Sequence, residues 1–206
     1  MEKKVTFTAE NLVLEGLYRK ISAVHGAIIT HPHPLYGGDM ANPVVESLVS
    51  SFNKKRYTTL RFNFRGVGGS EGQYDEGIGE QEDILAAVDF LLDQGMQSIL
   101  LVGYSFGAWV LARMKEMPVE ISGQVFVSPP VALLPYEKGL ILPLLQLVIT
   151  GEDDEIAPLG LLEKALSGWN PEARLEVVDF ADHFYYGCFP ALEKIILDYL
   201  SIQGTA

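Results

Sequence analysis

Ser105 lies in a sequence setting that can turn a serine hydroxyl into a nucleophile. An apolar run over residues 99–102 ends at Gly103, and Ser105 and Gly107 complete the pattern Gly-x-Ser-x-Gly. Apolar residues then recur at helical spacing, so the pattern predicts a buried strand, a sharp turn and a helix. Such a turn exposes the serine oxygen and leaves space only for glycine beside it. The structural alternative is a glycine-rich turn in which the serine caps the helix.

A nucleophilic serine needs a base that takes its proton and an acid that orients the base. In the strand–turn–helix arrangement, the acid and then the histidine follow the serine along the chain. Of the four histidines, only His183 follows Ser105, in the loop 181–187 before the last predicted helix. We therefore predict His183 as the base. The alternative is a histidine in a polar surface loop.

The acid is expected after the strand that precedes this loop. Residues 147–150 form an apolar run that leads into Gly-Glu-Asp-Asp-Glu at positions 151–155. We choose Asp154 as the acid and keep Asp153 in reserve. Asp179 and Asp182 are weaker candidates because they lie so close in sequence to His183. The alternatives are a solvated acidic turn or a cation site, although the spacing of a calcium loop is missing.

Two backbone N–H groups are needed to stabilise the oxyanion of an acyl-transfer reaction. One is expected from Phe106, the residue after the nucleophile, and the other from the loop 31–38 after an earlier strand. The two prolines of that loop have no N–H, which leaves three donors: His33, Leu35 and Tyr36. Of these we select Leu35.

Two further motifs could bind a metal or a cofactor. His31 and His33 are two residues apart, but no cysteine or third histidine lies nearby to complete a metal site. The glycine-rich run 66–72 lacks the Gly-Lys-Ser/Thr of a phosphate loop and does not match Gly-x-Gly-x-x-Gly. We therefore expect neither a metal nor a cofactor.

The composition narrows the class of protein further. The chain has 206 residues, 48% of them hydrophobic, which suits one domain over residues 1–206. Its net charge of −12 opposes nucleic acids and anionic membranes as partners. The N-terminus lacks a signal-like apolar core, and the apolar patch 140–149 is too short to span a bilayer. We expect a cytoplasmic protein.

Strand and helix patterns alternate along the chain. Strands are predicted within 3–24 (two, as an antiparallel pair) and at 26–30, 57–64, 98–102, 124–127, 144–149 and 175–180. Helices are predicted from the Asn42–Pro43 start to residue 52, over 79–94, from 106 to near 118, and over 159–166 and 191–199. This order predicts an α/β fold with a mainly parallel, doubly wound sheet and helices on both faces.

Taken together, four motifs resemble the α/β-hydrolase superfamily over roughly residues 26–200. They are Arg-Gly-Val-Gly-Gly-Ser at 65–70, the turn around Ser105, the acid turn 151–154 with Pro158, and Ala-Asp-His-Phe at 181–184. More narrowly, the loop 31–38 and Arg-Phe-Asn-Phe-Arg-Gly at 61–66 resemble small, lidless bacterial hydrolases related to dienelactone hydrolases. Dienelactone hydrolases themselves use a cysteine nucleophile where this chain has Ser105. The family's usual acid position, three residues after the turn glycine, supports Asp154.

These observations predict a serine hydrolase that cleaves a small or medium carboxylic ester or thioester through an acyl-enzyme. The segment between the strands at 124–127 and 144–149 is short, which predicts an open site with apolar walls and no lid domain. We expect a small-molecule substrate and a monomer or homodimer. The alternatives are an amidase, a peptidase or a haloperoxidase-like enzyme with the same triad, or a binding protein that keeps the fold without turnover.

Overall fold

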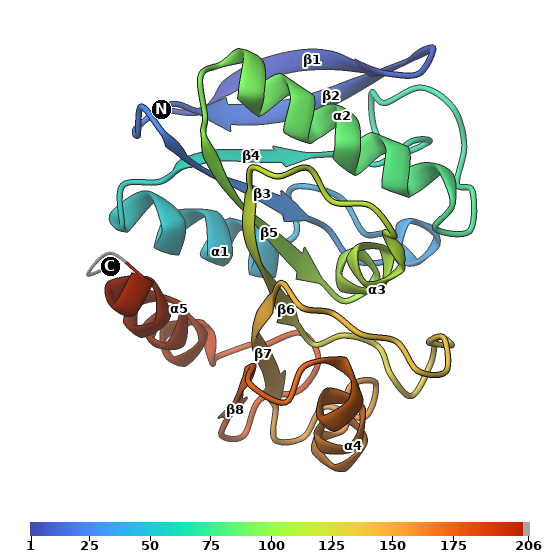
Figure 1. Cartoon of the computed structure of the whole chain (residues 1–206), viewed down its shortest axis with the longest axis vertical. Helices are drawn as coiled ribbons and strands as arrows, with labels where there is room; N and C mark the ends of the chain where they lie inside the picture. Colours follow the sequence, from blue (N-terminus) through green and yellow to red (C-terminus); the bar gives the residue numbers. More distant parts are fainter. Residues whose placement is uncertain (204–206) are drawn as a thin grey trace.

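The computed structural model describes residues 1–203, in which eight strands form one sheet with the order β1-β2-β4-β3-β5-β6-β7-β8 (Figure 1). The antiparallel part consists of β1 (Lys3–Ala9) and β2 (Leu12–Arg19), and β2 joins the sheet by pairing with β4. The remaining strands are parallel: β3 (His25–Thr30), β4 (Thr58–Phe62), β5 (Ser98–Tyr104), β6 (Ile121–Val127), β7 (Leu145–Gly151) and β8 (Arg174–Val178). This architecture confirms the predicted mainly parallel α/β fold.

Helices cover both faces of the sheet, and each face has its own hydrophobic cluster (Figure 1). One face carries α1 (Pro43–Lys54) and α5 (Phe189–Gln203). The other carries α2 (Gly79–Asp93), α3 (Phe106–Arg113) and α4 (Leu159–Trp169). Because the central strands are buried on both sides, they are nearly continuous apolar runs, as Ile99 to Val102 in β5 illustrates.

Several predicted boundaries were wrong. The helix after Ser105 ends at Arg113, well before residue 118, because Met114 already adopts an extended backbone. The strand predicted over 175–180 lies at Arg174–Val178, and Phe180 has a left-handed φ of 58°, which ends strand geometry. A short 3₁₀ helix, η1 (Pro34–Tyr36), was not predicted. The start of α1 is as predicted, with Asn42 accepting a hydrogen bond from the Val44 N–H.

Parallel strands bring distant loops to one edge of the sheet, because their carboxyl ends all point the same way. The loop after β3, the turn after β5, the acid turn after β7 and the loop after β8 all begin at this edge. The segment 128–144 between β6 and β7 consists of turns without a helix or strand, so it adds no lid helix over the edge.

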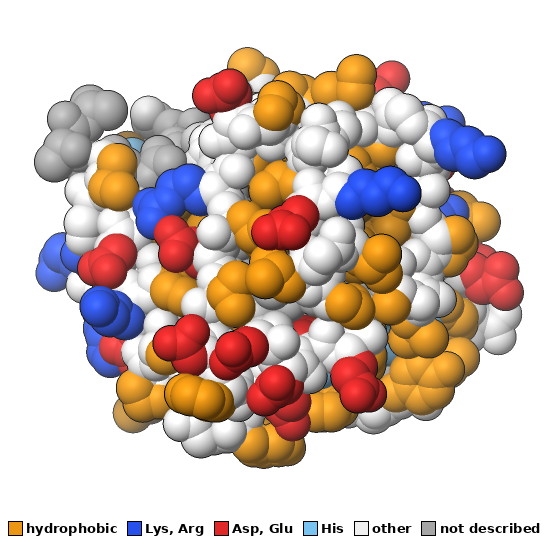
Figure 2. Space-filling view, turned by 90° about the horizontal axis from the view of Figure 1, so that it is seen from below, with side chains coloured by type: hydrophobic (Ala, Val, Ile, Leu, Met, Phe, Trp, Pro, Cys, Tyr) orange, Lys and Arg blue, Asp and Glu red, His pale blue; other side chains and the backbone are white. Residues whose placement is uncertain are grey.

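The surface reflects the acidic composition. Figure 2 shows acidic side chains along the lower part of the face seen from below, with hydrophobic side chains gathered at its right-hand edge. In the part of the chain that the structure describes, no helix combines the length and the apolar character needed to cross a membrane.

Candidate active site

Ser105 occupies the sharp turn between β5 and α3 and has a left-handed backbone, with φ 52° and ψ −114°. Such a conformation in a non-glycine residue costs about 1–3 kcal/mol and persists only where its surroundings hold it. The surroundings here are tight. A Cβ at Gly103 would lie 2.5 Å from the Cα of Ala108, and one at Gly107 would lie 2.2 Å from Oγ1 of Thr30. Only glycine fits at these two positions without a shift of the turn, as the sequence pattern predicted.

The structure brings together the three residues predicted as nucleophile, base and acid. Nε2 of His183 lies 2.9 Å from Oγ of Ser105, and Nδ1 lies 2.9 and 3.0 Å from the two carboxylate oxygens of Asp154. All three are buried, with exposed fractions of 7%, 7% and 3%. Since Nδ1–H donates to the carboxylate, neutral His183 has its lone pair at Nε2, where it can accept the Ser105 proton.

The turn after β7 fixes the Asp154 carboxylate beside His183 and leaves Asp153 exposed to solvent. Oδ1 of Asp154 accepts the N–H groups of Ile156 and Ala157 at 2.9 and 2.8 Å. Burial alone would raise the pKa of Asp154, but the hydrogen bond and charge of His183 lower it below its ordinary value. Asp153 is exposed, and its N–H donates to the carbonyl of Ala181. The geometry therefore favours Asp154 over Asp153.

Two buried residues that the sequence analysis missed lie behind Asp154. The side chain of Ser128 lowers the pKa of Asp154, and its hydroxyl lies 2.8 Å from the hydroxyl of Tyr185. Ser128 and Tyr185 both have left-handed backbones, with φ of 47° and 57°. Neither residue forms part of a recognisable motif, so no sequence signal pointed to them. The hydroxyl of Tyr104 also contributes, by donating to the carbonyl of His183 at 2.9 Å.

The two predicted oxyanion donors fare differently. Phe106 is the first residue of α3, and its N–H has no protein acceptor within residues 1–203, so it is free for a ligand. For the second donor, the geometry favours His33 over Leu35. Its N–H donates to Nδ1 of His33 at 3.2 Å, and its side chain is 66% exposed outside the cavity that contains Ser105. His33, one of the three donors left open, lines that cavity, and its N–H has no acceptor in the described chain.

Ser105 opens into a cavity of about 300 Å³. No aspartate, glutamate, lysine or arginine lines it, and most of its walls are apolar or aromatic: Pro32, His33, Tyr36, Gly37, Gly38, Asn42, Tyr104, Ser105, Phe106, Pro130, Leu133, Leu134, Ile156, His183 and Phe184. A larger hollow of about 460 Å³ lies between residues 131–140 and α4. Because no serine, histidine or cysteine lines that larger hollow, the smaller cavity is the candidate active site.

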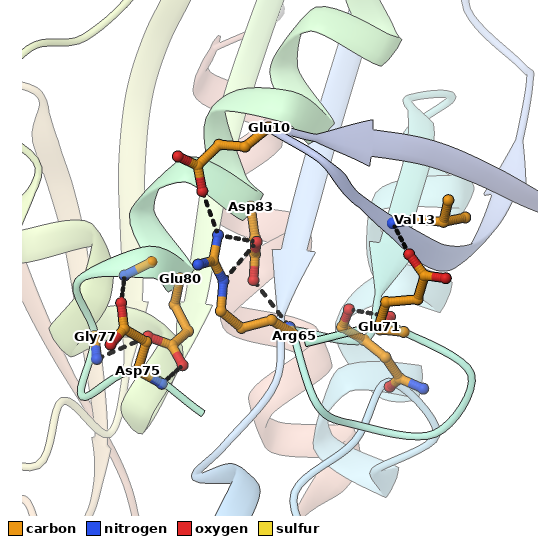
Figure 3. A network of polar contacts seen from close by, with 11 residues as sticks. Glu10, Val13, Arg65, Glu71, Asp75, Gly77, Glu80 and Asp83 are labelled. Atoms are coloured by element: carbon orange, nitrogen blue, oxygen red, sulfur yellow. Dashed lines mark hydrogen bonds and ion pairs between the residues drawn. The ribbon is translucent and has the colours of Figure 1, made fainter. Parts of the chain in front are cut away.

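The loop between β4 and α2, which contains the glycine-rich run, is held by a network of carboxylates (Figure 3). Asp83 accepts hydrogen bonds from Nε and Nη2 of Arg65 at 3.0 and 2.8 Å and from its N–H at 2.9 Å. Glu80 accepts the N–H groups of Asp75 and Gly77 at 2.8 and 2.7 Å. The loop thus brings Tyr74 against Phe106 and His33, with ring centroids 5.8 and 5.2 Å apart. Carboxylates that accept its N–H groups make this loop a structural support for the site.

The contacts of His31 and His33 give little support for a metal site at these two histidines. His31 uses both ring nitrogens in contacts with backbone atoms, and Nδ1 of His33 accepts the Leu35 N–H. Among the described residues, no group of three or more histidine, cysteine, aspartate or glutamate side chains could hold a metal ion.

The sequence of the chain was compared with protein-family models and with known proteins, and both comparisons found relatives. The model of the alpha/beta hydrolase family matches residues 24–196. An uncharacterized protein of Rickettsia prowazekii is 35% identical over 205 residues, which cover 93% of this chain and 86% of that protein.

Two solved structures are similar along most of their length. An alpha-beta serine hydrolase homologue from Coxiella burnetii is 30% identical, with a TM-score of 0.87 and coverage of 96% of this chain and 97% of that one. A serine hydrolase without a lid from Xanthomonas campestris is 27% identical, with a TM-score of 0.84 and coverage of 95% and 91%. These similarities confirm the predicted lidless hydrolase fold. The chain belongs to the alpha/beta hydrolase family.

Proposed function

We propose that the protein is a serine hydrolase that cleaves small or medium carboxylic esters or thioesters through an acyl-enzyme intermediate. The observation that carries the proposal is the unbroken line of hydrogen bonds from Ser105 through His183 to Asp154, at 2.9 Å for each step. The strained backbone of Ser105 supports it, because strain that the surroundings maintain is typical of functional sites.

In the first half of the reaction, Oγ of Ser105 attacks the carbonyl carbon while Nε2 of His183 takes the hydroxyl proton. The carbonyl π electrons move to oxygen, and the resulting oxyanion accepts hydrogen bonds from the free N–H groups of Phe106 and His33. Asp154 stabilises the imidazolium that forms. When the tetrahedral intermediate collapses, the bond to the leaving group breaks and His183 gives the proton to the departing alcohol or thiol.

The second half repeats the first with water in place of Ser105. His183 takes a proton from water, the hydroxide attacks the acyl carbon, and the bond to Oγ of Ser105 breaks. The acid leaves and Ser105 regains its proton from His183. The residues therefore return to their starting state, and one water is consumed for each ester.

The cavity indicates the size and polarity of the substrate. A space of about 300 Å³ without a charged wall residue suits uncharged acyl and alcohol groups of small or medium size. The rim residues Leu133 and Phe184 are 54% and 50% exposed, so the cavity is accessible from solvent. A buried cation to bind a charged acid or phosphate is not among the lining residues.

A fluorophosphonate probe tests the proposal directly. The wild type should be labelled at Ser105, and Ser105→Ala should not be labelled. A panel of p-nitrophenyl esters, acyl thioesters and aminoacyl amides then identifies the bond that is cleaved, with esters and thioesters expected to react. Cleavage of amides in preference to esters would favour the amidase alternative, and an unlabelled, well-folded wild type would favour a binding protein without turnover.

A further inference from the structure

His31 is a completely buried histidine beside the site, and the proposed reaction does not use it. It follows the last residue of β3 and begins the loop that carries His33. Nε2 of His31 lies 3.1 Å from the backbone nitrogen of Phe64, and Nδ1 lies 2.7 Å from the carbonyl oxygen of Pro32. Both ring nitrogens are thus engaged by the backbone of two different loops.

These two contacts define which nitrogen carries the proton. The Phe64 N–H is a donor, so Nε2 must be an acceptor. A neutral imidazole then has its hydrogen on Nδ1, which donates it to the Pro32 carbonyl. Burial lowers the pKa of His31 to about 4, so the ring is neutral at physiological pH.

The Pro32 carbonyl and the His33 N–H belong to the same peptide group. No peptide bond in the described chain is cis, so the C=O and N–H of this group point in opposite directions. A hydrogen bond that holds the carbonyl toward His31 therefore turns the N–H of His33 away from it. That N–H has no protein acceptor in the described chain, and Pro32 and His33 line the Ser105 cavity.

We propose that His31 is a positioning residue: its Nδ1–H holds the Pro32 carbonyl so that the His33 N–H faces the oxyanion. The inference rests on the proposed hydrolase function, because it assigns the second oxyanion donor of that reaction. The Phe64 N–H fixes the ring itself and so ties the orientation of the peptide to the end of β4. The ring edge of His31 also packs against Phe64, with centroids 4.8 Å apart.

Two substitutions separate this role from simple packing. His31→Leu removes both contacts, whereas His31→Asn keeps an N–H donor near the place of Nδ1, within reach of the Pro32 carbonyl. We expect His31→Leu to lower kcat for an ester by about 10²–10³-fold with little change in KM, the loss typical of one oxyanion donor. His31→Asn should recover at least about tenfold of that loss, although its Tm falls as well.

Ile28→Ala is the matched control for lost stability, because Ile28 is fully buried in β3, the strand that leads to His31, and lies outside the site. It should lower Tm comparably and leave kcat within about threefold of the wild type. Inhibition by a trifluoromethyl ketone, which forms a tetrahedral oxyanion on Ser105, should weaken in His31→Leu in proportion to kcat/KM.

The tautomer of His31 can also be measured in the wild-type protein, so this test does not depend on the folding of a variant. Nitrogen-15 NMR of the histidine rings at neutral pH should show the Nδ1–H tautomer for His31. An Nε2–H tautomer would overturn the proposal, as would a His31→Leu enzyme within about threefold of wild-type kcat or a His31→Asn enzyme no better than His31→Leu. If His31→Leu does not fold, the tautomer and the His31→Asn activity decide. Failure of the hydrolase function itself is distinct, because wild-type Ser105 would then resist the fluorophosphonate probe.

Discussion

The hydroxyl of Tyr185 lies 2.8 Å from the hydroxyl of Ser128, and the Ser128 side chain in turn lowers the pKa of Asp154. Both hydroxyl-bearing residues are completely buried and have left-handed backbones. Side chains from the loops after β6 and β8 therefore form a bonded pair beside the proposed acid, which its own turn also fixes.

Tyr185→Phe should therefore weaken the site without removing a reacting group. The substitution leaves the buried Ser128 hydroxyl with one partner fewer, which costs about 1–3 kcal/mol of unfolding free energy. We expect kcat to fall severalfold while KM stays unchanged. Urea denaturation and steady-state kinetics measure the two effects, and Tyr186→Phe, at an exposed neighbouring position, is the control. Unchanged kcat in a destabilised Tyr185→Phe enzyme would limit Ser128 and Tyr185 to a structural role.

Substitution of the three reacting residues should give large and non-additive losses. Ser105→Ala or His183→Ala should each lower kcat by about 10⁴–10⁶-fold, and the double variant should be no worse, because the residues act as one unit. Asp154→Asn should also cost several powers of ten. Asp153→Asn is its matched control, since Asp153 is adjacent but exposed. A loss at Asp153 equal to that at Asp154 would contradict the assignment of the acid.

Two glycines should respond in opposite directions to the same substitution. Gly107→Ala places a Cβ 2.2 Å from Oγ1 of Thr30, so the turn must shift and both probe labelling and Tm should fall. Gly168→Ala, inside α4, has no atom within 4 Å of the added Cβ and should gain up to about 1 kcal/mol from helix propensity. Thermal unfolding of both variants, with labelling of Ser105, measures the contrast. Equal tolerance would mean that the turn is looser than the structure shows.

The stability of the protein should depend on pH through Asp154. The pKa of Asp154 in the folded state lies below the ordinary value of 3.8. The folded chain therefore stabilises the ionised form of this carboxylate more than the unfolded chain does. The contribution is therefore present above pH 3.8 and is lost as pH falls through the lowered folded pKa. Urea unfolding of the wild type and Asp154→Asn across this range should show a difference in free energy that shrinks toward low pH. A constant difference would contradict the lowered pKa.

Much of the site could be predicted because its parts are local in sequence. Gly103 and Gly107 reveal the turn by their spacing, and chain order selects His183 among the histidines. The second oxyanion donor could not be found in this way. On our proposal, the choice between Leu35 and His33 depends on which way one peptide faces. That orientation depends in turn on the His31 ring, which is held by Phe64, 33 residues further along the chain.

Ser128 and Tyr185 were missed for a related reason. The two residues are 57 positions apart in the sequence, and they matter because their hydroxyls contact each other in the fold. A single serine and a single tyrosine form no sequence motif that would predict this contact. The helix after Ser105 was predicted too long because its apolar periodicity continues to Met114, whereas the backbone of Met114 is already extended. Local patterns thus locate the strands and turns, and tertiary contacts decide where they end.

The turns of residues 128–144, which form no helix or strand, have a consequence for the order of events during turnover. In the proposed reaction, neither binding of the ester nor release of the acid requires a lid to open. In that reaction, water reaches the acylated Ser105 through the same opening that admits the substrate. Turnover should accordingly be limited by bond making and bond breaking, and be insensitive to solvent viscosity.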